Sequence, residues 1–265
     1  MKTIRDLSIL FVFLIFLVPA QSHGIVYFQE SFNQGNLPYS FDYYKFGYSN
    51  NPIQTYHDNS GGVNDSGCHR IPLGGPGRTN FDVHIGKNVP NLSQYYLRFY
   101  LWVNQSFNTD PGANWKLTYN YHENHNFVFW MRPMADGLGF QPAFYNTVID
   151  RDLIKTQNVP TFYLSNFKGQ WICFEYYVNL NTNTVKLWIT TLGGEYNQTL
   201  YISSNNFPNS GTRVGSIKLG AYWDGTGDSN YFKLDEVVIS DQYIGPVGIT
   251  PNPAPSAPSN LRIVQ

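Results

Sequence analysis

The alternation of side chains between Tyr96 and Val103 constrains the fold of this chain more than any other feature. Successive side chains of a β-strand point to opposite faces, so a strand over this segment has two distinct sides. The apolar side consists of Leu97, Phe99, Leu101 and Val103, and the other side consists of Tyr96, Arg98, Tyr100 and Trp102. Large rings beside hydrogen-bonding groups are typical of a surface that holds a flat, polyhydroxylated molecule. Sugars are therefore the first class of ligand to consider.

Several other stretches show similar alternation, and together they predict the fold class. The strands that we expect are 25–32, 95–103, 115–122, 126–132, 171–180, 185–191, 216–223 and 231–240. Aromatic residues make up 17% of the chain, 23 glycines and 16 prolines supply turns, and helical periodicity is rare. These features favour an all-β sandwich. Residues 33–93 are expected to form short strands and long loops, and 148–154 fit either a short helix or a strand.

The two ends of the chain differ in character from the middle. Lys2 and Arg5 precede an apolar run from Leu7 to Val18, and small residues follow, so residues 1–20 are predicted to be a secretory signal peptide. An uncleaved anchor is the alternative, although the run is short for a membrane-spanning helix. We expect one folded domain over 24–246 and a Pro-rich tail over 247–265. The protein is thus expected to be secreted, periplasmic or attached to the cell surface, with no membrane span after cleavage.

The net charge narrows the classes of possible partner, and the two cysteines leave two structural alternatives. The formal net charge is −1, which argues against nucleic acid as a partner. Cys68 and Cys173 are the two cysteines. In an exported protein they could form a disulfide, whereas Cys173 could equally be a small buried residue inside a strand.

Three segments carry a resemblance to a known class of domains. They are Phe28–Phe32, Trp171–Asn181, and Tyr231–Ser240 followed by Ile244-Gly-Pro246. In order and spacing they resemble secreted bacterial jelly-roll domains of the concanavalin A-like class, which includes laminin G-like modules and several polysaccharide lyases. The resemblance implies a two-sheet antiparallel jelly-roll sandwich. It does not select an activity, because the Glu-x-Asp-x-x-Glu run of laminarinase-like hydrolases and the Arg-Thr-Glu-Leu-Arg and Gln-Ile-His motifs of an alginate lyase family are absent.

The outward faces of the predicted strands supply a candidate binding surface. If these strands share one sheet, their rings and charges would merge into one groove, in which positive charges outnumber a single carboxylate. The predicted substrate-binding residues are Arg98, Tyr100, Trp102, Lys116, Trp130, Arg132, Glu175, Tyr177, Trp188, Lys218 and Tyr222. Such a surface favours an anionic polysaccharide, for example a polymer of uronic acids. The alternative is that some of these rings pack beneath loops or against a second sheet.

Whether such a groove would be catalytic stays open at this stage. A polysaccharide lyase needs a base for the proton α to the uronate carboxyl, and a cation or amide that stabilises the resulting charge. The candidates for the base are His122 with Tyr100 or Tyr177, and the candidates for the stabilising groups are Arg98 or Lys116 with Asn120. A retaining hydrolase would need two carboxylates about 5 Å apart, and Glu175 has no acidic partner on its own face. A surface or adhesion module with a protein partner is the second alternative to carbohydrate binding.

The resemblance also implies a metal site. Related jelly-roll modules often hold a structural Ca²⁺ where the first and last strands meet, using an early carboxylate and the aspartate of a Leu-Asp-x-Val pattern. Glu30 and Asp235 match those positions, and their hard oxygen ligands suit Ca²⁺. Alternatively, Asp235 hydrogen-bonds to backbone at the edge of a sheet.

Overall fold

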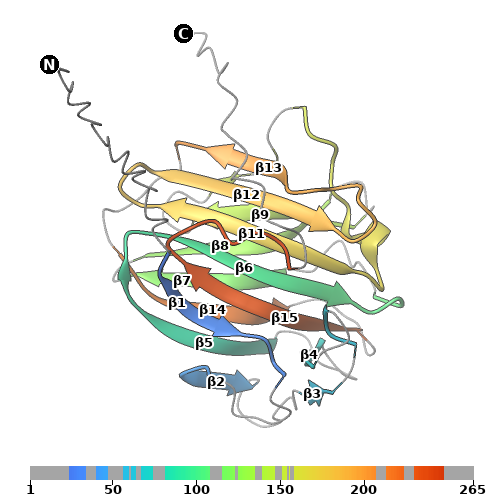
Figure 1. Ribbon diagram of the computed structural model, residues 1–265. Helices are drawn as coiled ribbons and strands as arrows, with labels where there is room; N and C mark the ends of the chain where they lie inside the picture. Colours follow the sequence, from blue (N-terminus) through green and yellow to red (C-terminus); the bar gives the residue numbers. More distant parts are fainter. Residues whose placement is uncertain are drawn as a thin grey trace, which may run out of the picture.

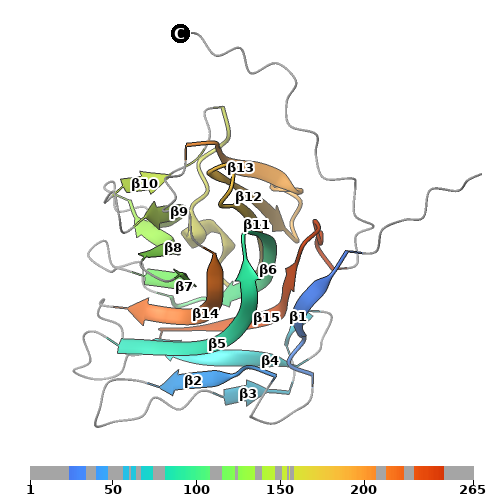
Figure 2. The same cartoon turned by 90° about the vertical axis from the view of Figure 1, so that its left-hand side faces the viewer.

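The chain folds into two antiparallel β-sheets packed face to face, as Figures 1 and 2 show from two directions. This computed structural model describes residues 24–33, 40–46, 56–59, 61–63, 67–73, 81–107, 115–122, 125–134, 139–146, 151–153, 155, 158–206, 213–223 and 230–247. They contain fifteen strands and one short 3₁₀ helix, η2 (Leu164–Phe167). The all-β jelly-roll sandwich predicted from the sequence is confirmed. The described part of the chain has no helix long and apolar enough to cross a membrane.

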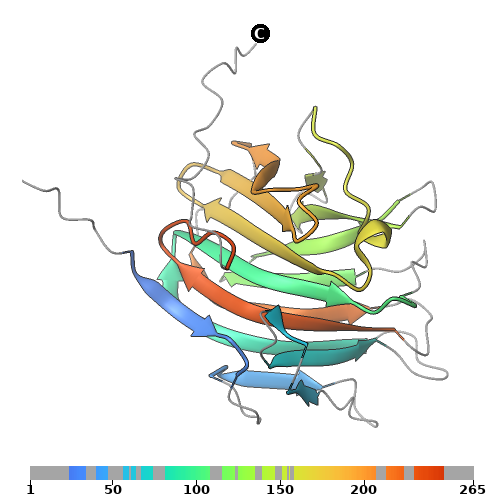
Figure 3. The same cartoon turned by 45° about the vertical axis from the view of Figure 1, so that its right-hand side comes forward.

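The first sheet has eight strands. From one edge to the other they are β13 (Thr199–Ser204), β12 (Thr184–Thr191), β11 (Trp171–Asn179), β6 (Gln94–Val103), β15 (Asn230–Ser240), β4 (Cys68–Leu73) and β3 (Tyr56–Asp58). Strand β1 (Val26–Glu30) also pairs with β15, beside which it runs in Figure 3. The first and last strands of the domain are therefore neighbours in this sheet.

The second sheet has seven strands. Their order is β10 (Arg151–Leu153), β9 (Phe140–Asn146), β8 (His125–Pro133), β7 (Trp115–His122), β14 (Val214–Trp223), β5 (Phe81–Leu92) and β2 (Tyr43–Phe46). All seven strongly alternating segments after residue 94 are strands, with bounds within two residues of those expected. The segment 148–154, left open as helix or strand, contains β10. Strands β9 and β13 were missed, because neither has a clear alternating pattern.

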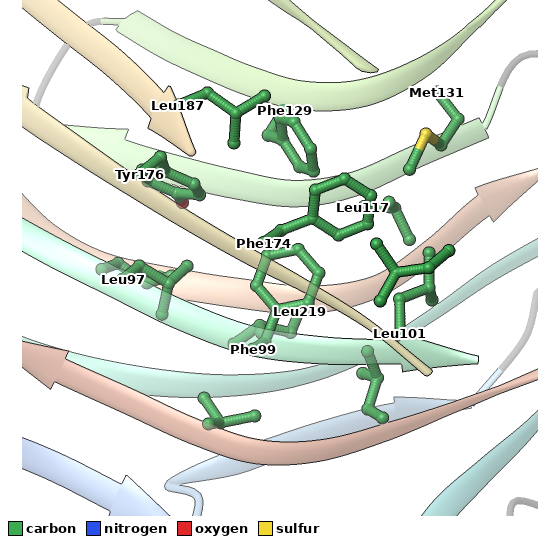
Figure 4. Close-up of a cluster of buried hydrophobic side chains, with 14 of the residues drawn as sticks. Leu97, Phe99, Leu101, Leu117, Phe129, Met131, Phe174, Tyr176, Leu187 and Leu219 are labelled. Carbon is green, nitrogen blue, oxygen red and sulfur yellow. The ribbon is translucent and has the colours of Figure 1, made fainter. Parts of the chain in front are cut away.

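The apolar faces of the two sheets form a common core, which Figure 4 shows in close-up. Alternation places one row of each strand in this layer, as expected for β6 from its sequence. Phe129 of the second sheet lies with its ring centroid 5.9 Å from that of Phe99 and 5.5 Å from that of Phe174. All three rings are fully buried. Burial of each such side chain contributes about 2 kcal/mol, so the core accounts for much of the stability.

A polar cluster lies inside this apolar layer. The side-chain oxygen of Asn120 accepts hydrogen bonds from the hydroxyls of Tyr95 (2.7 Å) and Tyr176 (2.9 Å). Its amide nitrogen donates to Thr118 Oγ1 and to the carbonyl of Phe127, each at 3.3 Å. Asn120 is fully buried and links the two sheets. Its predicted place on an outward, catalytic face is therefore wrong.

We expect Asn120→Ala to lower the free energy of unfolding by about 3 kcal/mol, because it leaves buried tyrosine hydroxyls short of a partner. Asn88, an exposed asparagine on β5 of the same sheet, is the matched control. Asn88→Ala should change stability by less than about 0.5 kcal/mol. Urea denaturation followed by far-ultraviolet circular dichroism measures both. Equal effects of the two substitutions would contradict the inward placement of Asn120.

Candidate functional site

The predicted binding residues lie on both sheets and do not form one groove. Those on the outer face of the first sheet are Arg98, Tyr100, Trp102, Glu175, Tyr177 and Trp188, whereas Lys116, Trp130, Arg132 and Lys218 belong to the second sheet. Strand positions also put Tyr222 and His122 in the second sheet, but their side chains lie outside the described residues. The two groups face opposite sides of the sandwich, so the single merged surface expected from the sequence is wrong.

A β-bulge explains why part of the second-sheet surface was not predicted. Between Lys116 and Thr118 the register of β7 against β8 shifts by one residue. A strand changes the face of every later side chain at such a bulge. Thr118 therefore points into the core, and Tyr119 and Tyr121 take the outer positions that strict alternation had given to Thr118 and Asn120.

Aromatic rings and cations lie together on the outer face of the second sheet. The rings of Tyr119 and Tyr121 stack with centroids 5.8 Å apart and planes 17° apart. Lys218 Nζ, from the neighbouring β14, lies 4.2 Å from the centroid of Tyr121. Lys116 Nζ lies 5.9 Å from the centroid of Tyr119. All four side chains are half-buried, so each presents part of its surface to solvent.

The same face continues across β8 and β9. The rings of Trp130 and Tyr145 have centroids 6.3 Å apart. Val128 is paired in register with Tyr119 on one side and Tyr145 on the other, and it is almost completely buried although it points away from the core. We call the residues Lys116, Tyr119, Tyr121, Trp130, Arg132, Tyr145 and Lys218 the aromatic face. Three of the seven, Tyr119, Tyr121 and Tyr145, were not predicted from the sequence.

The middle of the outer face of the first sheet is covered by the chain itself. Residues 241–247, which we call the C-terminal strap, follow β15 and fold back across β6 and β11. The two carboxylate oxygens of Glu175 accept hydrogen bonds from the backbone N–H groups of Ile244 (2.7 Å) and Gly245 (2.8 Å). Gly245 has φ +76°, a conformation that favours glycine. The Ile244-Gly-Pro246 motif is thus the part of the strap held by Glu175.

Further predicted sugar contacts hold the same strap. Arg98 donates to the carbonyl of Gly245 at 2.9 Å and pairs with the carboxylate of Glu236 at 3.3 Å. The hydroxyl of Tyr100 accepts the backbone N–H of Val247 at 2.6 Å. The ring of Trp188 lies against that of Tyr243, with centroids 5.4 Å apart. Arg98, Tyr100, Glu175 and Trp188 are all buried, so the structure gives them a role in holding the strap rather than in an open groove.

The predicted lyase residues do not form one centre. Asn120 is buried between the sheets, and Arg98 and Tyr100 lie beneath the strap on the first sheet. Tyr177 lies on that same sheet, with its ring centroid 4.7 Å from that of Tyr96 and a tilt of 32° between the rings. His122 ends β7 in the other sheet. A base and a charge-stabilising group must both reach one substrate atom. Arg98, Tyr100 and Tyr177 share the outer face of the first sheet, but Arg98 and Tyr100 are buried beneath the strap.

The carboxylates expected to hold calcium bind backbone instead. Glu30 accepts the N–H groups of Phe32 and Ser40, both at 2.9 Å. Asp235 accepts those of Val63 and Glu236, both at 2.7 Å. Glu30 points to the same side of β1 as the core-facing Phe28. Asp235, in contrast, points to the side of β15 away from the core-facing Leu234. These two side chains therefore do not fit one shared Ca²⁺ site, and no group of three or more metal-ligating residues occurs among the described residues.

Cys68 and Cys173 are both free and buried in one small apolar cluster with Tyr100 and Trp171. Burial raises the pKa of each thiol to about 12. Both cysteines are therefore packing residues, the second of the two alternatives left by the sequence.

One end of the first sheet remains open beyond the strap. Trp102 is half-buried there and lines a pocket of about 680 Å³ with Arg70, Tyr231 and the segment Asn104–Ser106. Of the predicted binding residues on this sheet, Trp102 thus lines this pocket.

Comparisons with known proteins support the fold. No family model and no curated protein matches the chain. The crystal structure of the receptor binding domain of botulinum neurotoxin C/D mosaic serotype is similar at 10% identity and TM-score 0.50, over 83% of this chain and 48% of that chain. The botulinum neurotoxin serotype D binding domain is similar at 12% identity and TM-score 0.50, over 84% and 49%.

A third structure is the catalytic domain of a glycoside hydrolase family 131 protein from Coprinopsis cinerea. It is 12% identical with TM-score 0.47, over 82% of this chain and 84% of that chain. The chain spans about half the length of the two neurotoxin structures. At such low identity the likeness concerns the fold alone. Membership of the concanavalin A-like or laminin G-like class stays a prediction from the sequence motifs.

The burial of Glu175 beneath the strap predicts a pH dependence of stability. Burial raises the pKa of this carboxyl from 4.5 to about 7, while the two backbone N–H groups and Arg98 act in the opposite direction. The folded state therefore binds this proton more tightly than the unfolded state. The resulting stabilisation is complete below pH 4.5 and is lost as the pH rises through about 7.

We expect the free energy of unfolding to fall between these pH values by up to about 1.4 kcal/mol per pH unit from this group. Glu175→Gln should remove that slope, although it also costs stability because one N–H loses its acceptor. Glu195→Gln, at an exposed carboxylate, is the control and should keep the slope. Denaturant titrations at several pH values measure this, and parallel profiles for wild type and Glu175→Gln would contradict it.

Proposed function

We propose that this protein binds an acidic polysaccharide across the aromatic face of the second sheet. The observation that carries the proposal is the gathering of four half-buried rings and three cations on four adjacent strands. Rings with an apolar surface suit the C–H faces of sugars, and the polar groups around them suit hydroxyls and acidic groups. This surface replaces the merged groove expected from the sequence.

The dimensions of the aromatic face suit a polymer better than a single sugar. Its residues come from β9, β8, β7 and β14, which are consecutive in the sheet. Three strand spacings amount to about 14 Å. A chain lying across these strands would meet Tyr145, Trp130 and the stacked pair Tyr119 and Tyr121 in turn. A row of this kind favours the inner units of a polysaccharide.

The cations favour an acidic polymer over a neutral one. Lys218 and Lys116 rest against tyrosine rings, which holds their ammonium groups near the ring surface. Arg132 lies beyond Trp130 on β8, with an intermediate exposure. Carboxylates or sulfates on a polymer would meet a positive group on either side of the rings. Binding should accordingly weaken as salt is added.

The comparisons are compatible with a binding role. The neurotoxin domains with a TM-score of 0.50 are described as a receptor binding domain and a binding domain. The predicted signal peptide would bring the protein into contact with extracellular polysaccharides. The lyase alternative receives no support, because Asn120 is buried in the core, Arg98 and Tyr100 are buried beneath the strap, and His122 belongs to the other sheet.

We expect Trp130→Ala and Tyr121→Ala each to weaken binding of polygalacturonate or alginate about tenfold or more, as is typical of aromatic contact residues. Lys218→Met should weaken binding of these acidic polymers while hardly changing any binding of neutral dextran. Isothermal titration calorimetry and affinity electrophoresis measure the changes. Tyr163→Ala, beside η2, and Lys186→Met, on the first sheet, are matched controls that should bind as wild type does.

Ultraviolet absorbance recorded during the same incubations separates binding from elimination, since a lyase would generate a conjugated double bond. Stable absorbance with measurable binding is the expected result. Binding that survives both ring substitutions would contradict the role of the aromatic face. Failure to bind any acidic polymer in the panel would favour a protein partner instead.

A further inference from the structure

A pocket on the first sheet is separate from the aromatic face and differs from it in shape. It lies where β6 ends and is lined by Arg70 of β4, Trp102 of β6, Tyr231 of β15 and the segment Asn104–Ser106. Its volume of about 680 Å³ is that of a small-molecule site. The two sheets face opposite sides of the sandwich, so a ligand here cannot also lie on the aromatic face.

Two aromatic rings and a guanidinium lie close together in this pocket. The guanidinium carbon of Arg70 lies 3.8 Å from the centroid of the Tyr231 ring. The centroid of the Trp102 ring lies 5.5 Å from that of Tyr231, with a tilt of 33° between the rings. Stacking on a ring fixes the plane of a guanidinium and leaves its N–H edge available for a carboxylate.

Arg70 differs from its neighbour Lys233 in whether its charge is paired with a carboxylate. Lys233 lies 5.1 Å from the Trp102 ring, and its ammonium pairs with Asp58 at 2.7 Å. Arg70, which is directly paired with Lys233 in the sheet, forms no ion pair with any residue that the structure describes. A half-buried, stacked guanidinium of this kind is a preorganised site for an anion.

The remaining wall of the pocket supplies hydrogen-bonding groups in a fixed arrangement. Asn104 is buried, accepts the N–H of Tyr231 at 3.0 Å and donates to Ser106 Oγ at 2.7 Å. Gln105 is exposed. Its side-chain oxygen lies so close to Gly169 that a Cβ atom added to this glycine would be 2.6 Å from that oxygen. An amide and a hydroxyl thus stand beside the rings, where they can bind sugar hydroxyls.

We infer that this pocket binds a sugar residue that carries a carboxylate. Arg70 pairs with the carboxylate, Trp102 and Tyr231 contact the apolar faces of the ring, and Gln105 and Ser106 bind hydroxyls. A uronic acid and a nonulosonic acid such as N-acetylneuraminic acid share this chemistry. The inference does not rest on the aromatic face, because none of the residues is common to both surfaces.

The experiment uses trigalacturonate and 3′-sialyllactose, each compared with its methyl ester, which removes the charge. The protein is labelled with 5-fluorotryptophan, and its six tryptophans are followed by ¹⁹F NMR. Trp102→Phe identifies the signal of the pocket, and Trp130→Phe identifies that of the aromatic face. We expect at least one of the two acids to shift the Trp102 signal, and its ester to leave that signal unchanged. The acid that binds identifies the kind of sugar.

Arg70→Gln should weaken this binding about tenfold or more, and Arg70→Lys should restore only a part, because lysine lacks the planar fork. Arg213→Gln, at an exposed arginine, is the matched control. The inference is overturned if neither acid shifts the Trp102 signal at millimolar concentration, if the esters bind equally well, or if Arg70→Gln binds as wild type does. A shift confined to Trp130 would overturn it while leaving the proposed function intact.

Discussion

Each sheet of this sandwich has one apolar face, and the burial of those two faces against each other is the constraint on which the rest of the structure depends. Phe99, Phe129 and Phe174 meet in the middle of this layer. Once the inner faces are joined, the two outer faces carry every side chain that the core excludes. Function then depends on which outer face stays open. Here the faces differ, since one is crossed by the strap and the other presents rings and cations to solvent.

The strap shows how charged and aromatic side chains can be used for structure on a face that looks suited to a ligand. Glu175 and Arg98 are opposite each other in register on β11 and β6, and both bind the backbone of Gly245. A carboxylate that accepts two N–H groups and a guanidinium that donates to a carbonyl satisfy the polar backbone that a crossing segment must bury. The same side chains could bind a sugar, but here the backbone N–H and carbonyl groups of the strap occupy them.

The strands were largely predictable from the sequence, whereas the site was only partly so. The alternation over 95–103 identifies both faces of β6 correctly, because no bulge in this strand interrupts the row of side chains that faces the core. In β7 one extra residue after Lys116 reverses the phase, and no feature of residue type marks that position. The strap could not be foreseen either, because Glu175 and Gly245 are 70 positions apart and sequence pattern carries no such distance. Lys116, Trp130, Arg132 and Lys218 were placed on an outer face correctly, but on a different sheet from Arg98 and Tyr100.

The two open surfaces differ in the features of a ligand that they would select. In the proposed function, a row of rings along several strands would contact successive units of a polymer. Each contact would be weak, so selectivity would come from summed charge and from salt-sensitive attraction. In the role that we infer for the pocket, its stacked guanidinium would contact a single unit, and a ligand without a carboxylate would bind less well because it leaves Arg70 without its partner. Because the surfaces lie on opposite sheets, a protein with both proposed sites would hold two polysaccharide chains at once and would join them without any oligomerisation.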